Sequence, residues 1–378
     1  MKQYNIILCV LLLAAVQAAA QQKQIEGRWQ KFIKLEEYLQ PFWKADTIHD
    51  EIVQIIKYGD RAEGTLLFDS RKVISVRSAN LERTYKQGKD WTYGHSRIKL
   101  PARSKIPFLD KDSLTFTTEK PNWSMKGKTP GTFVLFNEGG YFRSMQIAIT
   151  YVAEKPQNWT GPLPVFADKM LPGTLRKLKN KEPFKVVFYG NSIETGANSS
   201  GFQNEPPYMP SWPELIVYQL RQTYGQQVQF DNQSVGGMLA QWGADHAIQR
   251  VVPQKPDLVI IGFGMNDGTF NVSPETYRRN VEAIIDKVTA TIPDAEFILI
   301  APMLANPFAT QSSIQELYKA ELDKLTRTGI VVADITGVHE ALLKRKSYQD
   351  MTGNNVNHPN DYLARWYAQF ISGILINR

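Results

Sequence analysis

The hydrophobic pattern of the chain changes near residue 184, and this change constrains the fold more than any other feature. Beyond it, the continuous apolar runs FKVVFYG, PDLVIIGFG, AEFILIAP and IVVADI alternate with stretches of helical character. Strands that are apolar on both sides belong to a parallel sheet covered by helices on both faces. One helix begins with Ser273 followed by Pro274, as expected of a capped helix. Residues 185–378 are therefore predicted to form an α/β domain with a parallel sheet.

The preceding half of the chain has a different pattern. Over residues 22–172 the apolar residues form short runs such as GTLLF, VISV, TFVLF and MQIAITYV, separated by Gly, Pro, Asn and Asp. This pattern predicts an all-β domain, a sandwich or jelly roll. The charged segment 173–184 is predicted to be a linker. Since no candidate catalytic residue precedes Gly190, we expect the β-rich half to be separable from the chemistry.

The N-terminus has the order of a secretory signal. A lysine at position 2 precedes an apolar run over 6–16, and small residues follow up to Ala20. The run is too short to cross a bilayer, which takes about 20 residues. We therefore expect residues 1–20 to be removed and the protein to be secreted or periplasmic, with no integral membrane segment. The only cysteine, Cys9, lies in this signal, so the mature chain has no thiol for disulfides or metal ligation.

The charge of the chain is basic but mixed. Its 44 Lys and Arg and 37 Asp and Glu give a net charge of +7, and both signs alternate in stretches such as KLEEYL and KAELDKL. This favours a solvated surface over a nucleic-acid interface, with attraction to acidic glycans as the lesser alternative.

Four short motifs carry the candidate chemistry. Three follow predicted strands, and in a parallel sheet ligands bind beyond the carboxyl ends of the strands. A serine needs a base within hydrogen-bond reach to attack an acyl carbon, and a histidine titrates in the right range for this task. Donors for the resulting oxyanion would be the Ser192 amide, the Gly237 amide and the Asn266 side chain. The motifs are Gly190-Asn191-Ser192, Gly236-Gly237, Gly264-Met265-Asn266-Asp267 and His358-Pro359.

The chain order Ser192, Gly237, Asn266 and His358 resembles the four blocks of the SGNH (GDSL-type) hydrolases, over residues from about 185 to 369. This resemblance implies a flavodoxin-like sheet, Ser192 as nucleophile and His358 as base, with no metal or cofactor. Exported relatives with an added β-sandwich resemble carbohydrate esterases, so the expected substrate is an acetylated polysaccharide or oligosaccharide. A lipase or thioesterase, and a glycan-binding protein with a decayed site, remain the alternatives. The sequence does not indicate an oligomeric state.

Two positions depart from the family pattern. Its Gly-Asp-Ser is Gly190-Asn191-Ser192 here, and its acid, three residues before the histidine, is replaced by Asn355. We expect Asn355 or a backbone carbonyl to orient His358, which makes a Ser-His dyad without a carboxylate. Asp350 and Asp361 are the alternative partners.

Several aromatic residues are candidates for sugar contacts. Tyr208, Trp212 and Trp242 follow the first two motifs, and either a sugar platform or core packing would explain them. The tryptophans of the β-rich half are expected mainly in the core; they include Trp43, Trp91, Trp123 and Trp159.

Overall fold

A computed structural model describes residues 27–155 and 158–377. The predicted signal over residues 1–20 lies outside the described residues. Within those that are described, no helix combines the length and apolar character needed to span a membrane.

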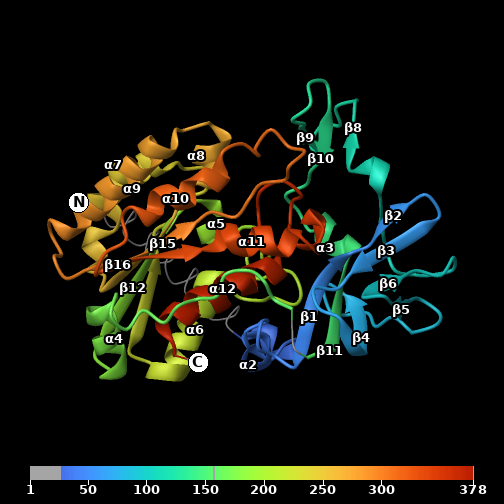
Figure 1. Cartoon of the computed structure of the whole chain (residues 1–378), viewed down its shortest axis with the longest axis horizontal. Coiled ribbons are helices and arrows are strands. Elements are labelled where there is room, and N and C mark those ends of the chain that lie inside the picture. The colour runs from blue at the N-terminus through green and yellow to red at the C-terminus, as the bar shows by residue number, and fades with distance from the viewer. Residues whose placement is uncertain (1–26, 156–157, 378) are drawn as a thin grey trace, which may run out of the picture.

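The C-terminal part contains a five-stranded sheet in the order β13-β12-β14-β15-β16, and every neighbouring pair is parallel. Figure 1 labels β12, β15 and β16 of this sheet. This confirms the predicted α/β fold. Successive side chains of a strand point to opposite faces. In β12, Val186 and Phe188 accordingly enter one apolar core, while Val187 and Tyr189 enter another. The strands are β12 (Phe184–Gly190), β13 (Val228–Asn232), β14 (Leu258–Gly262), β15 (Glu296–Ala301) and β16 (Ile330–Asp334).

Helices cover both faces of this sheet. The first core contains residues of α6 and α12, which pack against each other, and the second contains residues of the packed pair α7 and α9. Between β15 and β16, helix α10 ends early, because the chain turns after Asp323 and pairs Arg327 with Ile330 before β16. The helices are α6 (Trp212–Tyr224), α7 (Ala240–Arg250), α9 (Pro274–Thr289), α10 (Tyr318–Asp323), α11 (Ile335–Leu343) and α12 (Asp361–Leu375).

The N-terminal part is built of small, mainly antiparallel sheets, in agreement with the predicted β domain. One sheet has the order β1-β11-β4, with β1 (Thr47–Gln54), β11 (Gln146–Ala153) and β4 (Ser70–Ser78). Another has the order β5-β6-β3-β2-β7, with β5 (Thr92–Gly94), β6 (Arg97–Lys99), β3 (Arg61–Thr65), β2 (Ile56–Tyr58) and β7 (Leu109–Asp110). The third, which we call the arm, rises at the top of Figure 1 and consists of β8 (Thr115–Phe116), β10 (Phe133–Leu135) and β9 (Ser124–Lys126).

The segment predicted as a linker is instead mostly a helix. Helix α4 (Pro172–Lys179) buries Leu175 and Leu178, and the amides of Gly173 and Thr174 donate to the Glu296 carboxylate at 2.9 and 2.7 Å. Because these contacts reach the parallel sheet, residues 172–179 are part of the α/β domain and do not act as a free connection.

The two parts share a buried polar interface. Lys346 Nζ lies 2.6 Å from Glu51 Oε1, and both side chains are fully buried. Arg365 of α12 is 2% exposed and donates to the His49 carbonyl at 2.7 Å. Buried charges are tolerated only when they are paired. The expectation of a separable β-rich half therefore conflicts with this interface.

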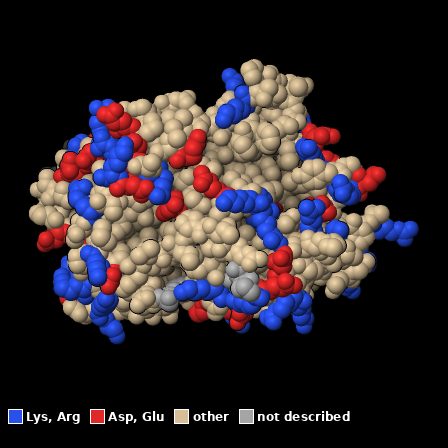
Figure 2. Space-filling view, viewed as in Figure 1, with Lys and Arg blue, Asp and Glu red and all other residues tan. Residues whose placement is uncertain are grey.

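The surface carries both signs of charge. Lys/Arg and Asp/Glu are interspersed at the upper left of Figure 2, whereas Lys and Arg are more numerous along its lower edge. The mixed pattern on this face agrees with a solvated surface.

Candidate active site

The predicted nucleophile, Ser192, is the first residue of the short helix α5 (Ser192–Thr195), which follows the carboxyl end of β12. Asn191 caps this helix: its Oδ1 accepts from the Ile193 amide at 3.0 Å, and its Nδ2 donates to the Gly262 carbonyl at 3.3 Å. Capping by a short polar side chain is a common role of Asn and Asp at this position. The change from the family's aspartate thus preserves the helix cap that presents Ser192.

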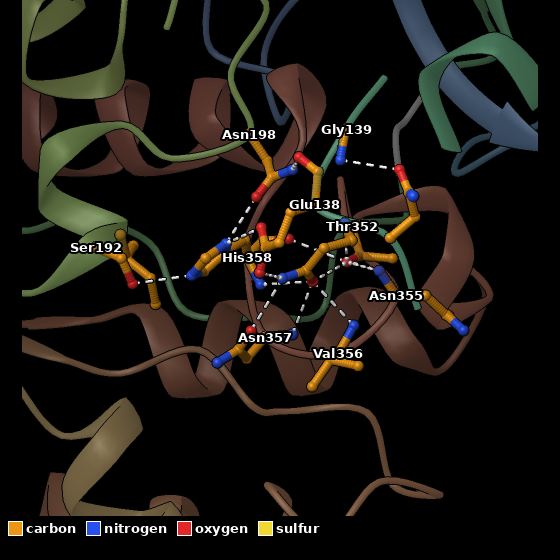
Figure 3. Close-up of polar contacts among 12 residues, drawn as sticks. Glu138, Gly139, Ser192, Asn198, Thr352, Asn355, Val356, Asn357 and His358 are labelled. Atoms are coloured by element: carbon orange, nitrogen blue, oxygen red, sulfur yellow. Dashed lines mark hydrogen bonds and ion pairs between the residues drawn. The ribbon is translucent and has the colours of Figure 1, made fainter. Parts of the chain in front are cut away.

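Ser192 and His358 meet at this turn (Figure 3). Ser192 Oγ lies 2.8 Å from His358 Nε2, although 166 positions separate the two residues. His358 comes from the loop before α12 and is 9% exposed. This is the contact that a histidine base needs to take the serine proton.

The other ring nitrogen of His358 faces two acceptors. Nδ1 lies 2.6 Å from Asn198 Oδ1 and 3.3 Å from Glu138 Oε2, as Figure 3 shows. Since neither an amide oxygen nor a carboxylate donates, Nδ1 carries a proton in this arrangement. Nε2 is then free to accept the Ser192 proton.

Asn355 does not take the orienting role that we expected. Its Oδ1 accepts from Gln349 Nε2 at 2.9 Å, and its Nδ2 donates to the Leu135 carbonyl at 2.8 Å. The backbone of Asn355 is left-handed, with φ of +66°, and its side chain contacts Leu135 of β10 instead of the imidazole. The amide therefore anchors the end of the arm.

The two alternative carboxylates are also engaged elsewhere. Asp350 accepts from the amides of Gln54 and Ser347 at 2.6 and 2.7 Å. Asp361, the first residue of α12, accepts from the Ser200 amide at 2.8 Å. Asp350 therefore connects the segment before His358 to β1, and Asp361 connects α12 to the segment after α5. Neither carboxylate is among the polar contacts of the His358 ring.

Glu138 precedes helix α3 (Tyr141–Met145) in the N-terminal part, and three polar contacts fix its position. Its Oε1 accepts from Asn354 Nδ2 at 3.2 Å, and its backbone carbonyl accepts from Asn198 Nδ2 at 3.0 Å and Gln203 Nε2 at 2.9 Å. Its side chain remains 54% exposed. Partial burial disfavours its charge, but the hydrogen bond and charge of His358, together with the Asn354 hydrogen bond, lower its pKa overall. Glu138 is therefore ionised at neutral pH.

The glycine and asparagine motifs adjoin the nucleophile. A Cβ placed on Gly236 would lie 3.7 Å from the Cβ of Ser192. Gly237 has φ of +80°, a conformation that glycine adopts without strain, and a Cβ there would meet open space. Asn266 Nδ2 donates to the Met238 carbonyl at 3.0 Å, which ties the third motif to the second. The candidate oxyanion donors thus come from connected loops.

Neither Glu138 nor Asn198 was identified from the sequence. Asn198 lies only six positions after Ser192, but nothing in GANSS distinguishes it from an ordinary turn residue. Glu138 lies in the half in which we expected no catalytic residue. The asparagine at position 355 indicated that His358 needs another orienting partner, but it did not indicate which residue this is. Among the described residues, no group of three or more His, Cys, Asp or Glu is arranged to hold a metal ion.

The buried Glu194 makes the stability of the site dependent on pH. Glu194 is 2% exposed and accepts from the Asn191 amide, and burial raises its pKa to about 8. Between the ordinary value of 4.5 and about 8, the unfolded chain releases this proton while the folded chain retains it. The free energy of unfolding therefore falls as pH rises, by up to about 1.4 kcal/mol per pH unit.

We expect Glu194→Gln, which resembles the protonated acid, to remove much of this fall. Urea denaturation of both proteins at pH 5, 6.5 and 8 measures the difference, which should grow with pH. A constant difference across this range would contradict a buried neutral Glu194.

Comparison with known proteins finds a family match in the C-terminal part. The family model of the GDSL-like lipase/acylhydrolase family matches residues 188–365, just under half of the chain. A search of curated proteins found no match.

The fold is also similar to those of solved structures. One is a two-domain esterase active on acetylated mannans, with 21% identity and a TM-score of 0.45 over 57% of this chain and 54% of that one, so the match spans about half of the esterase. Another is a putative GDSL-like lipase from Parabacteroides merdae, with 16% identity and a TM-score of 0.43 over 51% and 96% of the two chains. A third is a catalytic mutant of an acetylxylan esterase from Geobacillus stearothermophilus, with 16% identity and a TM-score of 0.41 over 51% and 94%.

Proposed function

We propose that this protein is an exported serine esterase that removes acetyl groups from carbohydrates, since its residues 188–365 match the family model of the GDSL-like lipase/acylhydrolase family. The observation that carries the proposal is the 2.8 Å contact between Ser192 Oγ and His358 Nε2. The same contact argues against a glycan-binding protein with a decayed site, since a decayed site has no reason to keep the pair aligned.

The reaction follows from this geometry. Ser192 Oγ attacks the acyl carbon of the ester while its proton passes to His358 Nε2, and the carbonyl oxygen becomes an oxyanion. The Ser192 and Gly237 amides and the Asn266 side chain are the proposed donors to that oxyanion. The imidazolium then gives its proton to the leaving sugar oxygen, which leaves an acyl-Ser192 ester. Water, deprotonated by His358, hydrolyses this ester and regenerates the serine.

Two aromatic residues on the segment that carries Glu138 support a carbohydrate substrate. Trp123 on the arm is 41% exposed and packs edge-to-face on Tyr141, with ring centroids 5.0 Å apart. In the sequence, Glu138 lies between the two aromatic residues, three positions before Tyr141. The amide of Phe136 donates to the Trp123 carbonyl at 3.1 Å, which holds Trp123 next to this segment. An exposed aromatic ring that also carries an N–H or O–H group suits a sugar, whose surface is partly apolar and partly polar. Trp212, by contrast, is 1% exposed and belongs to the core.

We expect Trp123→Ala to raise the KM for an acetylated oligosaccharide about tenfold, a loss of about 1.4 kcal/mol of binding. The same variant should hydrolyse p-nitrophenyl acetate within about twofold of the parent, because this small ester has no sugar for Trp123 to bind. Tyr58→Ala is the matched control, since Tyr58 is 45% exposed but lies on another sheet. Equal losses on both esters would argue against a sugar contact.

One group of residues favours a second candidate, an esterase of longer acyl chains. Three large apolar side chains are exposed near the Asn266 motif: Phe270, Phe308 and Leu317. The loops that carry the first two are linked, since Thr269 Oγ1 donates to the Gln311 carbonyl at 3.3 Å. Such a surface suits an apolar chain.

The test is acetate release from a panel of acetylated glycans, together with the rates on p-nitrophenyl acetate and octanoate. We expect release from at least one glycan and a preference for acetate. A preference for octanoate with no release from any glycan would favour the second candidate, and inertness toward every ester would refute an esterase.

A further inference from the structure

We propose that Glu138 is the carboxylate partner of His358, supplied to the active site by the N-terminal half of the chain. The inference rests on the proposed esterase function. Its first observation is the 3.3 Å distance between Glu138 Oε2 and His358 Nδ1, on the side of the ring opposite to Ser192. Glu138 acts through the histidine and is thus a positioning residue.

Asn198 and Glu138 divide the role of a triad acid between them. Asn198 Oδ1 is the nearer acceptor, at 2.6 Å, and the donation from its own Nδ2 to the Glu138 carbonyl fixes which end of the amide faces the ring. An amide holds the tautomer but carries no charge. Glu138 adds the negative charge that stabilises the imidazolium formed when Ser192 loses its proton.

The loop that carries Glu138 is fixed on both sides. Asn355, where the family has its acid, donates to the Leu135 carbonyl, three residues before Glu138. Beside it, Val134 of the arm, Ala309 and Val356 form a small buried cluster. The amide at 355 therefore anchors the segment that brings the carboxylate from the other half of the chain.

Other charged groups near His358 already have partners. Arg143 donates to the Asn198 carbonyl at 3.0 Å and pairs with Glu205 at 2.7 Å. Asp361, on the helix that follows His358, accepts from the Ser200 amide. On the Ser192 side lies the buried Glu194, whose raised pKa, caused by burial, keeps it neutral at pH 7. Among these groups, Glu138 is the one whose charge contacts the ring.

The experiment compares Glu138→Gln with Glu119→Gln, which removes the same charge from an exposed position on the arm. For Glu138→Gln we expect kcat for p-nitrophenyl acetate to fall about 30-fold, less than the roughly 10⁴-fold cost of amide replacement in a serine-protease triad, because Asn198 still holds the tautomer. We also expect the acidic limb of the pH profile to move to lower pH by about half a unit or more, since a nearby negative charge favours the protonated imidazole. Glu138→Asp should recover part of the rate, and Glu119→Gln should match the parent in both respects.

The pH profile of Glu138→Gln distinguishes a positioning role of Glu138 from a merely structural one. A parental rate for Glu138→Gln, or a loss of rate with an unmoved acidic limb, would overturn the inference. If the parent hydrolyses no ester, the proposed function fails, and the inference is then judged by NMR of protein labelled with ¹⁵N in its histidine rings. The ring of His358 should then lose its proton at lower pH in Glu138→Gln than in the parent; identical titrations would overturn the inference.

Discussion

Ser192→Ala is expected to lower kcat for ester hydrolysis at least about 10⁴-fold while leaving the fold intact. Ser192 Oγ is the atom in contact with His358 Nε2. Alanine lacks this oxygen, so the variant cannot form the acyl-serine ester. Losing the nucleophile of a serine hydrolase costs on the order of 10⁶, and the remaining activity comes from the oxyanion donors and binding. Turnover of p-nitrophenyl acetate, with circular dichroism as the check on folding, measures the loss.

Further variants show whether the loss of activity is specific to the Ser192–His358 pair. His358→Ala should lose nearly as much activity, and the double variant should be no worse, because the two side chains act as one unit. Ser313→Ala should keep the parental rate, since the Ser313 hydroxyl lies on a surface loop and donates to Asn271. If Ser192→Ala kept more than about a tenth of the parental rate, the nucleophile would have to be another residue.

A fragment that begins at Ala167, and so keeps α4 and the whole parallel sheet, is expected to be neither stably folded nor active. Removing the N-terminal part leaves Lys346 without Glu51 and Arg365 without the carbonyl of His49. Leaving one partner of a buried charged pair alone costs about 3 to 5 kcal/mol. Since the whole stability of a domain is about 5 to 15 kcal/mol, the loss of this ion pair and of the Arg365 hydrogen bond removes a large part of it.

Apolar packing adds to this loss. Phe42 stacks on Trp366 of α12, with centroids 5.0 Å apart, and Trp366 is fully buried. Thermal unfolding by circular dichroism and hydrolysis of p-nitrophenyl acetate measure the two effects. Supplying residues 21–166 as a separate chain is the control, because it should restore both folding and activity. A folded, active fragment would show that neither the interface nor Glu138 is needed.

The α/β fold was predictable because its signal is local. Each strand of the sheet is a short run of Val, Ile, Leu and Phe, and its burial is almost complete, as in β14 and β15. The segment 173–184 misled us because its lysines and arginines suggested a solvated linker, whereas Leu175 and Leu178 recur on one buried face of α4. Charged residues on the opposite face are ordinary in a surface helix.

The site was predictable only where its residues lie in short motifs. Ser192 and His358 belong to such motifs, and the structure brings them together. Glu138 is 220 positions from His358 and comes from a different sheet system, so no spacing rule connects them. We expected a Ser-His dyad because Asn355 occupies the position of the family's acid. This expectation assumed that an acid, if present, would lie near His358 in the sequence. The structure offers a carboxylate from the other half instead.

The central claim is that Ser192 forms the covalent intermediate with His358 as its base. Labelling with a fluorophosphonate, followed by mass spectrometry of the digested protein, tests this claim most directly. We predict one adduct on Ser192 in the parent, slow or absent labelling in His358→Ala, and none in Ser192→Ala. An adduct on any other residue, or labelling of Ser192→Ala at the parental rate, would contradict the claim.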